Sequence, residues 1–277
     1  MAKQFFQVEG ASIAYEVGGT GPCILFVPGG NGDCRIFKKI RNLLIGHFTV
    51  VIYDRRGFSY SRMTGPQNYD KAIDTDVEDI YNLMKSITNK QFVLFSNSLG
   101  GIIASKYLIR YPETVSQVFL HEPMFDLSSL PGGDIIRKKH EDIYNIYETE
   151  DETEGIKAVA RYYFNDLDYS VYEREPTGEV TRNRISYFKF VFFQYLFGKV
   201  NMDMLKNYND KLVLLKGEEC EGFFCAEPVD FLAKVLGNQV LIVPGGHIGF
   251  HTEADRFLND FMKIYREHGL IKSKPKL

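Results

Sequence analysis

Residues 92–101 read FVLFSNSLGG, an apolar run that passes through a small-x-Ser-x-Gly turn into a helical pattern. A serine in such a turn occupies a sharp strand-to-helix corner, and its hydroxyl stands clear of the backbone at the end of a sheet. The corner requires small residues two positions to either side of the serine, and here these are Ser96 and Gly100. The stretch therefore predicts a nucleophile elbow with Ser98 as the nucleophile. Taken alone, the motif also fits an ordinary β–α turn capped by serine.

The composition bounds the class of protein. The chain has 277 residues, of which 44% are hydrophobic and 25% charged, enough for one large core plus an insertion. Its net charge of -3 offers no basic stripe for nucleic acid. Neither the apolar segment of a signal peptide nor a membrane-spanning run of roughly 18 apolar residues is present. We expect a cytoplasmic monomer or homodimer that binds a small-molecule substrate and neither nucleic acid nor a membrane. The spacing of the four cysteines predicts reduced thiols.

Short apolar runs alternate with amphipathic helical segments over most of the chain. Continuous runs of β-branched and aromatic residues are typical of strands buried on both faces of a parallel sheet. Helical spacing of apolar residues predicts helices around 73–84, 99–111, 228–236 and 254–268. We expect strands at 5–8, 12–17, 23–27, 49–53, 92–95, 118–121, 212–215 and 240–243, the first two forming a hairpin.

The alternation stops after Glu122. Residues 123–210 show helical patterns only, around 135–147, 154–164 and 184–197. The sequence therefore predicts an α/β fold, with a mostly parallel sheet of about eight strands flanked by helices and built from residues 1–122 and 211–277. The all-helical insertion, residues 123–210, is expected to form a cap, or lid, over the elbow.

Two glycine-rich loops follow strands at the edge where open α/β sheets place their sites. In the first, PGGNG (28–32), the N–H of Gly30 would join the N–H of Leu99 in an oxyanion hole. The second, PGGH (244–247), places His247 at the same edge, as a general base toward Ser98 and then as an acid toward the leaving group. Strand-end positions for both side chains favour a catalytic triad over a solvated loop histidine.

Together, in this order, these motifs resemble those of the α/β-hydrolase-fold serine hydrolases. The core match rests on PGG (28–30), YDRRGFS (53–59), SNSLG (96–100) and GGH (245–247). Within that fold, VPGGNGDC (27–34), HEP (121–123) and VPGGH (243–247) are similar to segments of the zearalenone-type lactonases and of related bacterial hydrolases. The resemblance implies a serine hydrolase that needs neither metal nor cofactor. The chain has no Trp, whereas lactonases of that kind use a cap tryptophan at the ligand. We assign the DRRG turn (54–57) a structural role.

Two carboxylates compete for the place of the triad acid. Most relatives carry an Asp in a Gly-x-x-Asp turn after the strand at 212–215, but GEEC (217–220) puts Cys220 there and leaves Glu221 one residue off. Glu122 follows the strand at 118–121, which matches the lactonase-like arrangement. A carboxylate buried at a strand end is costly unless it is paired, and His247 would supply the partner. We favour Glu122.

The expected substrate site combines the first glycine-rich loop, through Gly29 and Asn31, with aromatic residues of the insertion. Residues 187–197 hold more aromatics than one buried helix face can use, so some of them, Tyr187, Phe190 and Phe193, are expected to line a pocket. The sequence thus predicts hydrolysis of a carboxylic ester or lactone through an acyl-enzyme. A C–C bond hydrolase or hydroxynitrile lyase on the same triad, and a ligand-binding receptor with a vestigial triad, remain alternatives.

Overall fold

The computed structural model describes residues 2–173 and 176–271. Its centre is a nine-stranded sheet with the order β1-β2-β4-β3-β6-β7-β8-β9, to which the short β5 adds beside β2. Strand β2 pairs antiparallel with β1, β4 and β5. The neighbouring strands in the order β4-β3-β6-β7-β8-β9 are all parallel. The strands are β1 (Gln4–Val8), β2 (Ala11–Gly19), β3 (Cys23–Val27), β4 (Thr49–Tyr53), β5 (Arg62–Met63), β6 (Phe92–Asn97), β7 (Val115–His121), β8 (Leu212–Gly217) and β9 (Val240–Val243).

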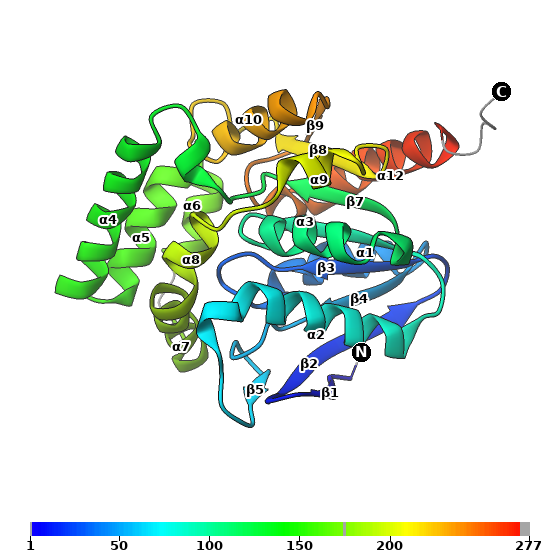
Figure 1. The fold of residues 1–277 in the computed structure, drawn as a ribbon, viewed down its shortest axis with the longest axis horizontal. Helices are drawn as coiled ribbons and strands as arrows, with labels where there is room; N and C mark the ends of the chain where they lie inside the picture. Colours follow the sequence, from blue (N-terminus) through cyan, green and yellow to red (C-terminus); the bar gives the residue numbers. More distant parts are fainter. Residues whose placement is uncertain (1, 174–175, 272–277) are drawn as a thin grey trace.

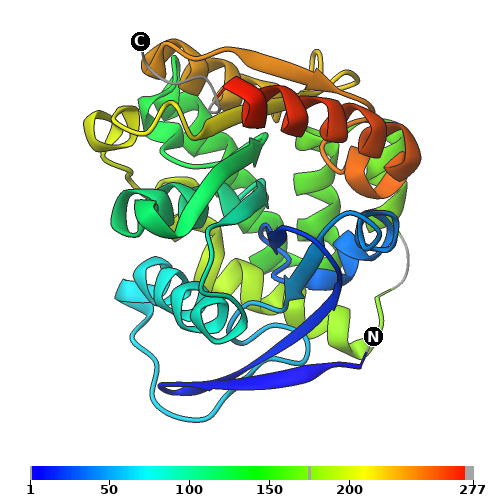
Figure 2. The same ribbon diagram turned by 90° about the vertical axis from the view of Figure 1, so that its right-hand side faces the viewer.

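Helices cover both faces of this sheet. Figure 2 shows α2 and α3 on one side of the strands and α1 and α12 on the other. Alternate residues of β3 follow this division, because Leu25 and Val27 belong to the first hydrophobic cluster and Ile24 and Phe26 to the second. The helices of the core are α1 (Lys38–Leu44), α2 (Ala72–Ile87), α3 (Gly100–Arg110), α10 (Ala226–Leu236), α11 (Gly249–Thr252) and α12 (Ala254–Ile271). The predicted α/β fold is confirmed.

Between β7 and β8 the described residues form helices and connecting loops only, so the predicted absence of strands in this insertion is confirmed. Helices α4 to α8 gather beyond one end of the strands (Figure 1), whereas α9 packs against α3 and α10. No described helix is long and apolar enough to cross a membrane. The helices of the insertion are α4 (Gly133–Thr149), α5 (Glu152–Tyr163), α6 (Asp166–Tyr172), α7 (Gly178–Ser186), α8 (Phe192–Leu196) and α9 (Met202–Lys206).

The insertion differs from its prediction in one segment. The single helix expected at 184–197 is divided into α7, a π-helical turn η5 (Tyr187–Val191) and α8. The wider turn lets large rings pack on one another: Phe188 stacks on Tyr147 of α4 with ring centroids 4.5 Å apart. Gly155 of α5 makes this contact possible, because a Cβ there would lie 2.8 Å from the Tyr147 Cβ atom. The short helices α6 and α9 were not predicted.

A buried histidine lies at the centre of the insertion. The Nδ1 atom of His140, in α4, lies 2.7 Å from the carbonyl oxygen of Ile136, and its Nε2 atom contacts the hydroxyl of Tyr163 in α5. Aromatic rings surround the imidazole. Burial lowers the pKa of His140 from 6.5 to about 4, with a smaller contribution from Arg137 and Lys139 that is opposed by the hydrogen bond to Ile136.

This geometry predicts a pH-dependent stability. Because the folded-state pKa of His140 is lowered, its stabilising effect is complete above pH 6.5 and is lost as the pH falls toward 4. In His140→Gln the side chain stays neutral, so the difference in unfolding free energy between wild type and variant should shrink by about 2 kcal/mol between pH 7 and pH 5. Urea unfolding at the two pH values measures this. A difference that does not change with pH would contradict the prediction.

Candidate active site

Ser98 occupies the sharp corner between β6 and α3. Its φ of +55° lies in the left-handed region, which a non-glycine residue adopts only when the surrounding structure enforces it. Here the Ser98 N–H donates to the carbonyl of His121 at 3.1 Å, and the Ser98 carbonyl accepts from the N–H groups of Gly101 and Met124, both at 2.9 Å. The corner also needs a glycine behind it, because a Cβ on Gly100 would lie 2.7 Å from the carbonyl oxygen of Val27.

Glu122 and His247 meet at the same edge of the sheet. The Oε2 atom of Glu122 lies 2.6 Å from His247 Nδ1, and its Oε1 atom accepts from the N–H of Gly217 at 2.8 Å. Both side chains are buried. Glu122 also has a positive φ, +45°, directly after β7. The contact leaves Nε2 as the nitrogen of His247 that is free of the carboxylate.

The environment keeps Glu122 ionised. Burial acts to raise the pKa of its carboxyl, but the hydrogen bond and charge of His247, with smaller contributions from His121 and Cys220, outweigh burial and lower that pKa to about 2. The neighbouring His121 is different, since burial lowers its pKa to about 4. His121 is therefore neutral at pH 7.

The loop that carries His247 is held from two sides. From the core, Asn97 Nδ2 donates to the His247 carbonyl at 2.9 Å. From the insertion, Asp168 Oδ2 accepts from the N–H of Ile248 at 3.0 Å, and Phe164 stacks on the imidazole with ring centroids 5.0 Å apart. The sequence analysis missed Phe164 and Asp168. Asn165 is the N-cap of α6, and this capping residue is the local sequence signal that could have predicted the helix that carries Asp168.

The first glycine-rich loop lies against the elbow. A Cβ on Gly29 would come within 2.9 Å of the Ser98 Cβ atom, so the chain approaches this closely only because residue 29 is glycine. The loop forms a turn in which the Gly32 N–H donates to the Gly29 carbonyl at 3.1 Å. Within the described residues, the N–H groups of Gly30 and Leu99 donate to no protein acceptor. Both are thus available to an oxyanion at Ser98.

A cavity of about 300 Å³ joins these groups. Ser98, His247 and the first glycine-rich loop form its floor, and residues of the insertion form much of its wall. Gly29, Asn31 and Tyr187 line it as expected. Apolar side chains that line it include Ile36, Leu99, Met124, Ile156, Val159, Phe164, Val171, Val180, Leu196 and Ile248.

Phe190 and Phe193 do not line this cavity, and the prediction that they do is wrong. Phe190 stacks on Tyr69 with ring centroids 4.3 Å apart, on the outside of the insertion. Phe193 packs against Tyr144 at 5.1 Å. The number of aromatics in residues 187–197 indicated that some of them line a cavity, but it could not say which, because the other rings pack among α4, the core and the π-helical turn.

The alternative acid lies elsewhere. Glu221 is exposed. Its neighbours in the same loop serve other contacts, since Glu218 pairs with Arg256 at 2.6 Å and Glu219 accepts from Asn165 of α6 at 2.7 Å. Among these carboxylates, Glu122 is the one that contacts His247.

Among the described residues, two clusters bring possible metal-ligand atoms within 4.8 Å of one another: Glu122 with Cys225 and His247, and Asp33 with Cys34 and Asp54. Both clusters are already engaged in protein contacts. In the first, the two carboxylate oxygens of Glu122 bind His247 and Gly217. In the second, Asp54 accepts from the Cys34 N–H at 3.0 Å and pairs with Lys3 at 3.2 Å.

Comparison with known proteins agrees with this fold. Residues 22–152 match the family model for the alpha/beta hydrolase fold. An uncharacterized hydrolase of Bacillus subtilis, YraK, is 30% identical over 270 residues, which cover 95% of this chain and 96% of that protein. The mouse serine hydrolase BPHL is 25% identical over 272 residues, 92% of this chain and 84% of its own. The chain belongs to the α/β-hydrolase family and is a hydrolase.

Solved structures show the same fold. A putative lipase from Acinetobacter baumannii superposes with a TM-score of 0.75 at 14% identity, covering 97% of this chain and 92% of its own. The enol-lactonase from Burkholderia xenovorans superposes with a TM-score of 0.66 at 17% identity, covering 95% of this chain and 100% of its own. The more specific resemblance to zearalenone-type lactonases stays a prediction.

Proposed function

We propose that the protein is a serine hydrolase that cleaves carboxylic esters or lactones through an acyl-enzyme. The observation that carries the proposal is the 2.6 Å contact between Glu122 Oε2 and His247 Nδ1, in a cavity that His247 shares with Ser98. This contact fixes the tautomer of the imidazole, with the proton on Nδ1 and a free lone pair on Nε2. A base in that form accepts the proton of a serine hydroxyl.

In the proposed reaction, Ser98 Oγ attacks the carbonyl carbon while its proton passes to His247 Nε2. The tetrahedral intermediate carries its negative charge on the former carbonyl oxygen, which the N–H groups of Gly30 and Leu99 stabilise. Its collapse breaks the bond to the alcohol oxygen, which takes the proton from Nε2. Water then attacks the acyl-enzyme by the same route and releases the acid. Ionised Glu122 stabilises the His247 imidazolium that forms during both acylation and deacylation.

The shape of the cavity points to a small or medium substrate of mainly apolar character. A volume of about 300 Å³ lies at the lower end of ordinary ligand sites. The cations at the wall are already engaged: Arg35 pairs with Glu179 at 3.0 Å, and Arg184 donates to the Tyr172 carbonyl at 3.1 Å. Apolar contact would therefore supply most of the binding energy.

Replacing the nucleophile tests the mechanism. Ser98→Ala should lower turnover of p-nitrophenyl esters by a factor on the order of 10⁴ to 10⁶ and abolish labelling by a fluorophosphonate, because no other group can form the acyl-enzyme. The melting temperature should not change, since the hydroxyl faces the cavity. EDTA should leave wild-type turnover unaltered. Near-normal turnover in the alanine variant would refute the mechanism.

The acid is tested by two matched substitutions. Glu122→Gln keeps an acceptor for Gly217 but cannot stabilise the imidazolium, so kcat should fall by a factor on the order of 10³ to 10⁴. Glu221→Gln changes an exposed side chain and should alter kcat by less than about twofold. Steady-state kinetics of both variants on one ester decide between them. A collapse in Glu221→Gln with normal activity in Glu122→Gln would reverse the assignment.

The cavity wall is tested by two aromatic residues of the π-helical turn, Tyr187, which lines the cavity, and Phe190, which does not. Tyr187→Ala enlarges the cavity beside Gly30, so the preference among acyl chain lengths should shift toward longer chains by about tenfold. Phe190→Ala should leave that preference within about twofold of wild type, because its ring lies outside the cavity. Specificity constants for esters from acetyl to decanoyl measure the shift. Equal profiles for the two variants would show that Tyr187 does not contact the acyl chain.

A further inference from the structure

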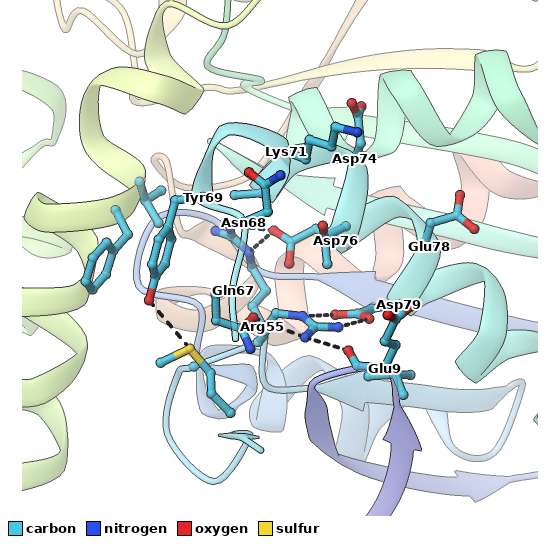
Figure 3. Close-up of a pocket in the computed structure, with 18 of the residues that line it drawn as sticks. Glu9, Arg55, Gln67, Asn68, Tyr69, Lys71, Asp74, Asp76, Glu78 and Asp79 are labelled. Atoms are coloured by element: carbon cyan, nitrogen blue, oxygen red, sulfur yellow. Dashed lines mark hydrogen bonds and ion pairs between the residues drawn. The ribbon is translucent and has the colours of Figure 1, made fainter. Parts of the chain in front are cut away.

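The DRRG turn, residues 54–57, lies between the first glycine-rich loop and a second, polar pocket of about 740 Å³. Figure 3 shows Arg55, Asp76 and Asp79 in this pocket, the two aspartates both on α2. Arg55 is only 1% exposed, so its guanidinium is held by protein groups rather than by water. A cation buried this deeply is costly unless each of its donors is satisfied.

Arg55 binds the glycine-rich loop at both ends. Its backbone N–H donates to the Gly32 carbonyl at 2.8 Å, and its Nη1 atom donates to the Gly29 carbonyl at 3.1 Å. The other two nitrogens of the guanidinium, Nε and Nη2, both donate to Asp76 Oδ2, at 3.0 and 2.7 Å. Asp76 thereby fixes the plane of the guanidinium and the direction in which Nη1 points.

We propose that Arg55 is a positioning residue for the oxyanion hole, acting through the peptide unit that joins Gly29 to Gly30. The carbonyl and the N–H of a trans peptide point in opposite directions. Holding the Gly29 carbonyl toward Arg55 therefore turns the Gly30 N–H away from Arg55, toward the cavity. The positive charge at the carbonyl also polarises the peptide and strengthens its N–H as a donor. Two glycines in sequence have no side chains to hold this orientation themselves.

The insertion contributes to the same arrangement. Tyr195 of α8 donates its hydroxyl to Asp76 Oδ2 at 2.8 Å, and its ring lies 4.6 Å from the guanidinium carbon of Arg55. Both Tyr195 and Asp76 are buried. The contacts run from the insertion through Asp76 and Arg55 to Gly29, so the docking of α8 and the orientation of the oxyanion donor depend on one buried carboxylate.

Arg56 supplies a matched control in the next position. It forms the same kind of two-bond pair with a buried aspartate of α2, Asp79, at 2.9 and 2.7 Å. Its Nη1 atom donates to the carbonyl of Glu9 at 2.9 Å and to Gln67 Oε1 at 3.2 Å, away from the glycine-rich loop. The two arginines therefore share a pocket, a helix partner and a type of ion pair, and of the two it is Arg55 that bonds to the loop.

The first experiment compares Arg55→Lys with Arg56→Lys. Lysine keeps the charge but cannot bind the aspartate and the loop carbonyl together. Arg55→Lys should lower kcat for an ester and the fluorophosphonate labelling rate by the same factor, about tenfold to a hundredfold, with KM within about twofold. Arg56→Lys should change neither rate by more than about twofold. Equal losses in the two variants, or a kcat loss without a labelling loss, would overturn the proposal.

A second pair of variants excludes misfolding as the cause. The double variants Arg55→Gln with Asp76→Asn and Arg56→Gln with Asp79→Asn replace each ion pair by neutral amides, so neither leaves an unpaired buried charge. Glutamine is too short to bond to both the amide and Gly29. The two double variants should have similar melting temperatures, and the Arg55 double variant should be labelled more slowly than the Arg56 double variant. A wild-type labelling rate in the Arg55 double variant would overturn the proposal.

The inference rests on the proposed function, but different experimental results would contradict the positioning role and the serine mechanism. Absence of ester turnover and of labelling in the wild type would overturn the serine mechanism. Normal wild-type rates with no contrast between the Arg55 and Arg56 variants would overturn only the positioning role.

Discussion

The Glu122 carboxylate has no exposed surface, so its charge has to be balanced inside the protein. His247 binds one of its oxygens and the Gly217 N–H binds the other. These groups belong to the ends of β7, β8 and β9, which are neighbours in the sheet. The charge thus ties three strand ends together. Because removing one partner would leave a buried charge uncompensated, the register of the strands and the position of the histidine depend on each other.

The insertion completes the site as well as covering it. Phe164 and Asp168 contact the loop that carries His247. Tyr187 lies against Gly30 of the first glycine-rich loop, and Tyr195 binds Asp76, the partner of Arg55. The proposed base and the proposed oxyanion donors are therefore both contacted by residues of the insertion or by groups that the insertion holds. A change in the insertion that alters the substrate preference can also alter the geometry of catalysis. Asp168 of α6 also lies so close to Gly246 that it leaves no room for a side chain there.

Where local chemistry dominates, the sequence was informative. The strands expected at 23–27, 49–53 and 240–243 agree with β3, β4 and β9 at both ends, because continuous apolar runs of this length fit a parallel sheet buried on both faces. The helix expected at 184–197 is present as an unbroken helical run that ends at Leu196, but it contains a π-helical turn at Tyr187–Val191 that the sequence did not predict.

The sequence by itself determined the family of the protein and a short set of candidate residues, since the elbow and the two glycine-rich loops are local motifs with local geometric requirements. Resemblance in the sequence favoured Glu122 over Glu221, and the tertiary structure puts the Glu122 carboxylate against His247. Only the tertiary structure brought Asp168 to the His247 loop and Arg55 to Gly29. These contacts join residues 26 to 125 positions apart. No pattern of neighbouring residues encodes them, because they arise from how strands and helices pack once the chain has folded.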